Sequence, residues 1–272
     1  VEQFLGFVLD GNNQETDSPM YHVTLGDYYS RPLSPDWKLI LTGALSQRSF
    51  PDASFVDSTD VYANVGFEWN LGDTKFFPTF GVAYNWLDGD DNLDRYVSDF
   101  MVTHSFSDTF KLIGGASAIA HRFTSDLEIR DANIYNGRVG FEHYLDPATA
   151  SVISFMAQIG TDKVEDDLSP FENDRWAVSL SGSRGIAQGI LLSADISYKN
   201  TDYDGKTNFF GQDREDEMYR ASITLNVFDW PAKGWRTIGK VAYTDVESED
   251  PLDDLYGYDR TEVGITFHRA FE

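Results

Sequence analysis

The chain has 272 residues, of which 41% are hydrophobic and 15% are aromatic, and its formal net charge is −24. This acidity argues against nucleic-acid binding, which depends on Lys and Arg that neutralise phosphates, and the 20 Phe, 14 Tyr and 6 Trp argue against a disordered acidic chain. The absence of cysteine excludes disulfides, thiolate metal sites and cysteine nucleophiles, and no run of about 18 apolar residues offers a membrane-spanning helix.

Apolar and polar residues alternate with a period of two along almost the whole chain, which is typical of β-strands with one apolar and one polar face. In the stretch DVYANVGFEWNL, Val61, Val65 and Trp69 share one face, whereas Asn64 and Glu68 share the other. The pattern predicts fourteen strands, most of them longer than the roughly five or six residues usual in soluble proteins. The predicted strands cover residues 2–10, 21–32, 37–49, 58–71, 76–87, 94–106, 109–123, 132–145, 150–162, 174–184, 189–202, 217–228, 235–247 and 257–271.

The connectors between these strands alternate between two lengths. The short ones contain Gly, Pro, Asp and Ser, which suit tight turns, and they lie at 34–36, 72–75, 107–108, 146–149, 186–188 and 229–234. The longer ones are acidic, and DGDDNLD at 88–94 is one of them. Strict alternation places all long connectors at one end of a single sheet, and we expect one domain over residues 1–272. A propeller, which a hairpin repeat of about 40 residues would also allow, lacks this alternation.

Ionisable residues in the middle of the strands lie on the polar face. A soluble sandwich would leave them in solvent, whereas a membrane barrel would place them in a wet lumen and turn the apolar face toward lipid. The even strand count, the two connector lengths and the aromatic residues near strand ends favour the barrel. We therefore predict an all-β fold, a transmembrane antiparallel up-and-down β-barrel of fourteen strands with both termini periplasmic. The residues expected to line the lumen are Lys38, Glu68, Asp99, Lys111, Arg138, Glu142, Asp195, Lys199, Arg220, Arg236, Lys240 and Glu262.

Aromatic residues near the strand ends are expected to mark the two membrane interfaces. They are Tyr29, Trp37, Trp69, Phe77, Trp86, Phe106, Tyr144, Trp176, Tyr198, Phe228, Trp235, Tyr243 and Phe271.

The final residues, EVGITFHRAFE, place Ile265, Phe267 and Phe271 on one face of an extended segment. Because a bilayer holds no water for unpaired backbone groups, the last strand of a membrane barrel has to close onto the first. A terminal apolar and aromatic strand resembles the insertion signal that the barrel-assembly machinery reads in bacterial outer-membrane proteins, with Phe267 and Phe271 as its key residues. Arg269 and Glu272 depart from that signal.

An even number of strands places both termini on one side, which is periplasmic in this class of protein. The acidic connectors are therefore expected outside the outer membrane of a Gram-negative bacterium, with outer-membrane lipid and lipopolysaccharide as partners. No signal peptide is visible at VEQFLGFVLD, and an exported protein would carry its leader before Val1. The outer carboxylates are expected to be solvated loop charges or, in a second interpretation, ligands of Ca²⁺ or Mg²⁺ that bridge to lipid phosphates. They include Asp88, Asp90, Asp91, Asp166, Asp167, Asp250, Asp253 and Asp254.

No catalytic motif stands out, since the sequence has no GxSxG elbow, no P-loop and no GxGxxG between a strand and a helix. None of the five histidines, at positions 22, 104, 121, 143 and 268, has metal-ligand spacing with another His or a carboxylate. We expect no enzymatic activity, no metal and no cofactor. The lumen list contains both signs of charge with a slight excess of basic residues. It is consistent with a narrow polar conduit in a monomer, or with one that ion pairs nearly close.

Three segments resemble the C-terminal barrel of the surface lipoprotein assembly modifier (Slam) family: LGFVLDGNNQ at 4–13, FFGQDREDEMYRASITL at 209–225 and YGYDRTEVGITFHRAF at 256–271. The resemblance implies a barrel of similar strand number that helps to secrete a protein or to move a lipoprotein cargo to the cell surface. The periplasmic tetratricopeptide domain usual in that family is not part of this sequence. The alternative is a monomeric passive diffusion porin for small polar solutes. A periplasmic domain upstream of Val1 would favour export, and a plain signal peptide would favour the porin.

Overall fold

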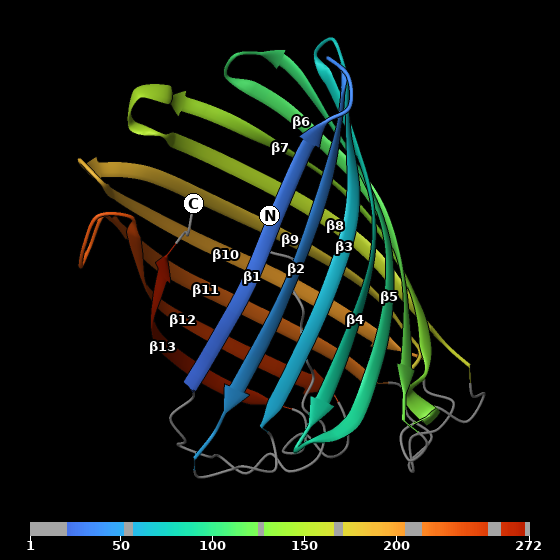
Figure 1. Ribbon diagram of the computed structural model, residues 1–272. Helices are drawn as coiled ribbons and strands as arrows, with labels where there is room; N and C mark the ends of the chain where they lie inside the picture. Colours follow the sequence, from blue (N-terminus) through green and yellow to red (C-terminus); the bar gives the residue numbers. More distant parts are fainter. Residues whose placement is uncertain are drawn as a thin grey trace.

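The computed structural model describes residues 21–51, 57–124, 128–165, 171–204, 214–249 and 257–269 (Figure 1). Its strands are β1 (Tyr21–Pro32), β2 (Trp37–Ser49), β3 (Ser58–Leu71), β4 (Thr74–Leu87), β5 (Asp90–Ser107), β6 (Phe110–Phe123), β7 (Ala132–Asp146), β8 (Ser151–Val164), β9 (Asn173–Ala187), β10 (Ile190–Tyr203), β11 (Arg214–Phe228), β12 (Trp235–Glu249) and β13 (Tyr258–Arg269). Among the described residues, two single-turn 3-10 helices, η2 (Glu128–Arg130) and η3 (Pro147–Thr149), lie in connectors. Within the described residues, no helix is long and apolar enough to cross a membrane.

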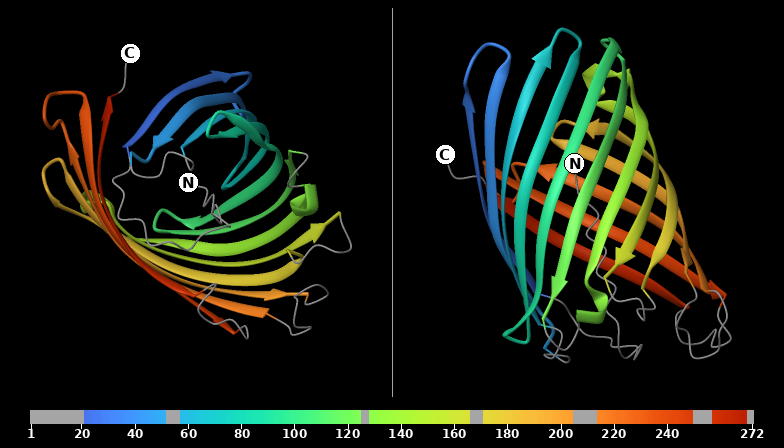
Figure 2. Two further views of the ribbon diagram at one scale, coloured as in Figure 1. Left: turned by 90° about the horizontal axis from the view of Figure 1, so that it is seen from below. Right: turned by 90° about the vertical axis from the view of Figure 1, so that its right-hand side faces the viewer.

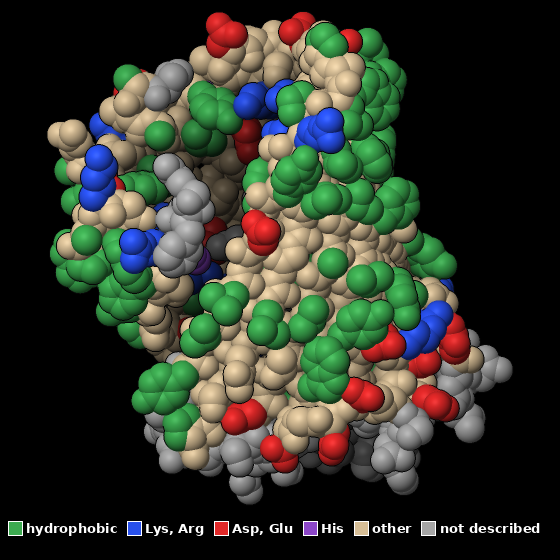
Figure 3. Space-filling model, viewed as in Figure 1, with side chains coloured by type: hydrophobic (Ala, Val, Ile, Leu, Met, Phe, Trp, Pro, Cys, Tyr) green, Lys and Arg blue, Asp and Glu red, His purple; other side chains and the backbone are tan. Residues whose placement is uncertain are grey.

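All thirteen described strands belong to one sheet, in which each strand pairs in antiparallel fashion with its neighbours in the sequence. The sheet curls until β1–β4 stand opposite β10–β13 (Figure 2), and the space-filling view shows a hollow inside the curl (Figure 3). β1 and β13 are the two edges of the described sheet, and the curl brings them to the same side of the molecule. This arrangement is the up-and-down barrel architecture.

The described strands correspond to all but the first of the fourteen predicted strands, and most bounds differ by only a few residues. The all-β antiparallel up-and-down fold is therefore confirmed. The predicted strand at 2–10 lies outside the described residues, as does Phe271 of the expected insertion signal. The other residue of that signal, Phe267, lies on β13 opposite Thr237 of β12.

One predicted connector is wrong. The acidic stretch 88–94 is not a long loop, because β4 and β5 are joined by a two-residue turn at Asp88 and Gly89. Both turn residues have positive φ, 51° and 86°, which is the backbone that a tight hairpin requires and that Asp-Gly adopts readily. β5 is consequently 18 residues long and contains Asp90 and Asp91, which we had expected in a loop. Short and long connectors therefore do not alternate strictly.

The two faces of the sheet differ in composition. One face carries large apolar side chains that stay exposed, such as Leu25 on β1 (67%), Ile159 on β8 (68%) and Ile265 on β13 (69%). The other face carries most of the hydrogen-bonded polar side chains. A sandwich would bury apolar residues of two facing sheets in a common core. The described residues contain no such core, since their buried apolar side chains are only Ala44, Leu93, Ala132, Ile134 and Ala242.

Candidate functional site

The strand register places all twelve residues predicted for the lumen on the face opposite to the exposed apolar residues. We call this face the inner wall, because it surrounds the hollow. Two pairs of opposite charge face each other directly on neighbouring strands. Lys38 is the register partner of Glu68, and Lys111 is the register partner of Glu142.

A buried ion pair joins two strands that are not neighbours. Arg138 on β7 donates to both carboxylate oxygens of Asp99 on β5 at 2.8 Å, and the Asp99 side chain is only 8% exposed. β6 lies between these strands, and its residue opposite Arg138 is Gly115. A β-carbon on Gly115 would lie 3.0 Å from the Nε atom of Arg138 and 2.7 Å from the carbonyl oxygen of Phe100. Glycine therefore makes the room through which the guanidinium crosses β6.

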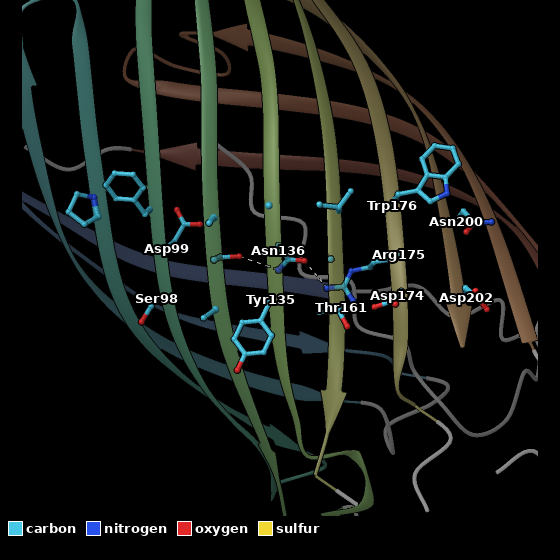
Figure 4. Close-up of a pocket in the computed structure, with 18 of the residues that line it drawn as sticks. Ser98, Asp99, Tyr135, Asn136, Thr161, Asp174, Arg175, Trp176, Asn200 and Asp202 are labelled. Atoms are coloured by element: carbon cyan, nitrogen blue, oxygen red, sulfur yellow. Dashed lines mark hydrogen bonds between the residues drawn. The ribbon is translucent and has the colours of Figure 1, made fainter. Parts of the chain in front are cut away.

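The same arrangement recurs two strands further along the sheet. Arg175 on β9 donates to the Oδ1 atom of Asn136 on β7 at 2.8 Å, across Gly160 on β8 (Figure 4). A β-carbon on Gly160 would lie 3.1 Å from both Nε and a terminal nitrogen of Arg175. Arg175 also pairs with Asp162 on β8, and Asn136 donates to the hydroxyl of Ser117 on β6 at 3.1 Å. The inner wall from β5 to β9 thus carries two neighbouring polar clusters, Asp99 with Arg138 and Ser117 with Asn136, Arg175 and Asp162.

Carboxylates on the remaining strands of the inner wall also have partners. Asp195 on β10 accepts a hydrogen bond from Ser222 on β11. Glu262 on β13 pairs with Arg260 of the same strand and lies 4.0 Å from a guanidinium nitrogen of Arg220 on β11. Arg220 and Glu262, both predicted for the lumen, are therefore brought together across β12.

Five predicted cations of the inner wall, Lys38, Lys111, Lys199, Arg236 and Lys240, form no ion pair with a carboxylate among the described residues. Arg236 on β12 donates through two nitrogens to the side-chain oxygen of Asn226, at 2.6 and 3.0 Å. Lys199 on β10 and Lys240 on β12 have no carboxylate oxygen within 4.0 Å among the described residues. The inner wall therefore holds cations whose charge is not neutralised by an ion pair.

Several inner-wall residues were missed by the sequence analysis because it considered mainly the middle of each strand. Arg175 and Asp162 belong to this group, as does Arg95, whose Nε donates to the Nε2 atom of His121 at 3.0 Å. Asp216 on β11 accepts from Ser248 and Arg214. Arg95 and Asp216 share the parity of Asp99 and Arg220, the predicted lumen residues of their strands, so extending the period-two pattern to the strand ends would have found them. No lumen residue was predicted on β8 or β9, which carry Asp162 and Arg175.

Aromatic side chains of the outer face pack against one another in two groups, which lie near opposite ends of the strands. Near the tight turns, Trp37 stacks on Trp69 with centroids 5.3 Å apart, and Trp69 stacks on Phe76 at 5.0 Å. Toward the other end, Tyr198 lies between Trp176 and Tyr219 at 5.1 and 4.9 Å. Two aromatic levels of this kind are typical of barrels whose strands cross a bilayer.

Three aromatic residues that were expected to mark the interfaces point inward instead. Phe77 packs beside Gly66 on the inner wall, as shown by the 3.0 Å that would separate a β-carbon on Gly66 from its ring. The Tyr144 hydroxyl bonds to Lys111 and Glu142, and the Phe228 ring lies beneath Arg236, the latter at 5.5 Å. These three residues do lie near strand ends, as predicted. Their position in the period-two alternation, however, places their side chains on the inner wall.

A groove of about 1150 Å³ crosses β4 to β10 at the level of the Arg175 network (Figure 4). The bulky residues that line it are mostly members of the apolar face, and small residues of β6 lie between them. They are Phe80, Phe100, Tyr135, Ile159 and Trp176, with Ala116 and Ala118. The groove therefore belongs to the outer surface of the curled sheet and not to the enclosed hollow.

The described residues contain no group of three or more His, Cys, Asp or Glu side chains that could hold a metal ion. The expectation that the chain is not an enzyme and needs no cofactor stays a prediction.

No protein-family model matches the chain, and no curated protein matches it. Among solved structures, the chain is similar to OccAB3 from Acinetobacter baumannii, with 11% identity, a TM-score of 0.48, and coverage of 89% of this chain and 67% of that one. It is also similar to the siderophore receptor PirA from Pseudomonas aeruginosa, with 9% identity, a TM-score of 0.37, and coverage of 93% and 62%. The open form of the ferric-catecholate import receptor Fiu from E. coli K12 matches with 8% identity, a TM-score of 0.39, and coverage of 95% and 63%.

The three matched structures are outer-membrane β-barrels. The chain spans only 62–67% of their lengths. The assignment of the fold rests on the strand order, the register and the two unlike faces of this chain itself.

Proposed function

We propose that this chain is an outer-membrane β-barrel whose inner wall forms a conduit for small polar solutes. The observation that carries the proposal is the distribution of side chains over one curled sheet. Apolar residues lie outside without any covering layer in the described part of the chain, and charged residues lie inside in ion pairs and hydrogen bonds. Figure 3 shows hydrophobic side chains spread over the outer surface around a hollow.

The outer face supports a membrane location because its exposed area is too apolar for water. Val263, Ile265 and Phe267 on β13 are 75%, 69% and 52% exposed, and Val23 and Leu25 on β1 are 63% and 67% exposed. Apolar surface in water costs about 25 cal/mol per Å², and soluble monomers rarely expose patches larger than a few hundred Å². Lipid removes this cost, and the two aromatic levels would lie at its interfaces. Outer-membrane lipid, lipopolysaccharide and the barrel-assembly machinery are the partners that this location implies.

The inner wall supports a conduit because its polar groups need water or partners. The side chains of Arg138 and Asp162 stay 23% and 20% exposed even while paired, so they face the hollow as well as each other. In a bilayer only a water-filled lumen or protein can satisfy such groups.

The test is channel recording with the full chain, extracted in mild detergent and added to a planar lipid bilayer. Discrete conductance steps are expected, with a heat-denatured sample as the control. A barrel that inserts but stays silent would contradict the conduit and leave the membrane location standing. A protein that remains monomeric in buffer without detergent would contradict the membrane location itself.

Export of a protein or lipoprotein is the second candidate. It rests on the three segments that resemble the Slam family. Of the segments that resemble the Slam family, 214–225 lies in β11 and 258–269 in β13, whereas 4–13 lies outside the described residues. Expression with a reporter lipoprotein tests this role, since export predicts protease-accessible reporter at the cell surface.

A further inference from the structure

Cations recur at one position in four of the six strands that follow the short connectors at 34–36, 72–75, 107–108, 146–149, 186–188 and 229–234; β8 and β10 have Val152 and Leu191 there. The second residue of β2, β4, β6 and β12 is Lys38, Lys75, Lys111 and Arg236, respectively. The register places all four on the inner wall, and Lys240 lies four residues beyond Arg236 on the same face of β12. We call these five residues the mouth ring. In Figure 3, Lys and Arg side chains gather around the hollow at its upper end, where the tight turns lie.

Neighbouring aromatic residues fix the level of the mouth ring. Trp37, Phe110 and Trp235 are the first residues of β2, β6 and β12, and each directly precedes a cation of the ring. Successive residues of a strand point to opposite faces. Aromatic side chains of an outer face settle at the membrane interface, so the cation that follows each one is held just inside the same end of the conduit.

The contacts of the mouth ring leave its charge in place. The Lys111 ammonium donates to the Tyr144 hydroxyl at 3.1 Å and lies 4.7 Å from the centre of that ring. Arg236 bonds to a neutral amide oxygen. Lys38, Lys75 and Lys240 have no carboxylate oxygen within 4.0 Å among the described residues. Lys111 and Arg236 thus have neutral hydrogen-bond partners, and none of the five cations forms an ion pair within 4.0 Å among the described residues, although Lys38 and Lys111 have Glu68 and Glu142 as register partners.

On the inner wall at this end of the barrel, carboxylates are fewer than cations. Glu68 accepts from Asn70 at 3.3 Å, and Glu142 accepts from Tyr144 at 3.1 Å. Asp195, the sixth residue of β10 as Lys240 is of β12, also lies on the inner wall and accepts a hydrogen bond from Ser222. The other acids at this end lie on the turns or at the strand end beside them. Asp146 and Asp229 accept turn backbone N–H groups, and the other three are exposed: Asp36, Asp73 and Asp108. Salt screens exposed charges over about 8 Å at physiological ionic strength, whereas the walls of a conduit focus the field of charges that line it.

We propose that the mouth ring makes the conduit selective for small anions over small cations. Rings of Lys and Arg side chains attract anions into a pore in the way that rings of Asp and Glu attract cations. The net charge of −24 for the whole chain does not oppose this selectivity, because an ion in the conduit responds to the charges on its wall. The inference rests on the proposed conduit function.

The test is the reversal potential of the full chain in a planar bilayer with a potassium chloride gradient. Chloride is expected to permeate several-fold better than potassium. The double variant Lys75→Glu and Lys240→Glu, which breaks no ion pair, should bring the permeability ratio to one or below. Lys111→Gln should lower the ratio in the same direction. The matched control is Arg184→Glu, an exposed residue near the same end but on the outer face, which should leave the ratio unchanged.

The outcomes separate this inference from the function on which it rests. A wild-type protein that never conducts contradicts the conduit, and the inference fails with it. A protein that conducts but passes potassium as well as chloride overturns the inference alone. An unchanged ratio in the mouth-ring variants, with the same heat-modifiable mobility as the wild type, overturns it as well.

Discussion

Single glycines decide which side chains meet on the inner wall. Glycine usually weakens a strand because it has no side chain to pack. Here Gly115 and Gly160 sit beneath guanidinium groups that cross from one strand to the next but one. At both positions the group that approaches the glycine is an arginine side chain.

Replacing Gly115 with alanine should destabilise the barrel by about 1–3 kcal/mol, which is the usual cost of overpacking a filled site. The added carbon would meet Phe100 backbone at 2.7 Å and Arg138 at 3.0 Å. Urea unfolding of barrels folded into lipid vesicles measures the loss. Gly239→Ala is the matched control, because a β-carbon there meets no atom within 4 Å. An equal loss in both variants would show that Gly115 makes no special room.

Parity along a strand predicts the face of a residue but not its partner. The face of Asp99 and Arg138 was readable from the period-two pattern. Their ion pair was not, because it joins β5 to β7 and depends on the register and on Gly115. Tyr144 shows the opposite case, since its parity with Glu142 already indicated an inward side chain. The prediction that Tyr144 marks a membrane interface is therefore wrong, because it followed from the nearness of Tyr144 to a strand end and not from its alternation with Glu142.

At the scale of one element, turn geometry outweighs composition. The acidic residues of 88–94 favoured a solvent-exposed loop. Instead, Asp88 and Gly89 form a two-residue turn, and β5 begins directly after them at Asp90. The hairpin forms because Leu93 and Arg95 still alternate in step with Asn85 and Ala83 on β4. Charged residues at the start of a strand are compatible with pairing when that end lies in water, so composition alone could not place this boundary.

Neighbouring residues in the middle of β9 test the assignment of the two faces. Leu180 is 44% exposed on the outer face, and Ser179 lies on the inner wall opposite Ser197. Leu180→Lys should cost about 2–4 kcal/mol, the penalty of a cation near the bilayer midplane on the lipid side of a barrel. Ser179→Lys should cost much less, because its ammonium enters the hollow. Unfolding free energies in vesicles compare the two, and a larger loss for Ser179→Lys would reverse the faces.

At the scale of the whole molecule, the number of strands decides how the sheet closes. Each described strand is antiparallel to the next, so β1 and β13 run in the same direction. Direct pairing of these edges would be parallel, whereas one further strand would join them in antiparallel fashion, as in single-chain bacterial barrels with even strand numbers. The strand expected at 2–10 would be that strand, and it remains a prediction because it lies outside the described residues.

Deleting residues 1–20 should prevent closure, because the open edges of β1 and β13 would then expose unpaired backbone groups to lipid. The expected result is loss of the compact, heat-modifiable form in detergent gels and a noisy or absent conductance. The wild-type chain prepared in parallel is the control. A truncated protein that keeps the compact form and steady conductance steps would mean that β1 and β13 pair directly.

The arginines that reach over an intervening strand add side-chain bonds around the circumference of the barrel, beside the backbone bonds between neighbouring strands. The bonds from Arg138 to Asp99 and from Arg175 to Asn136 link β5 to β7 and β7 to β9, and they resist any widening of this part of the wall. If the lumen widens to pass a larger solute, we expect the strands to move apart on the opposite side of the barrel, where β1 and β13 approach each other.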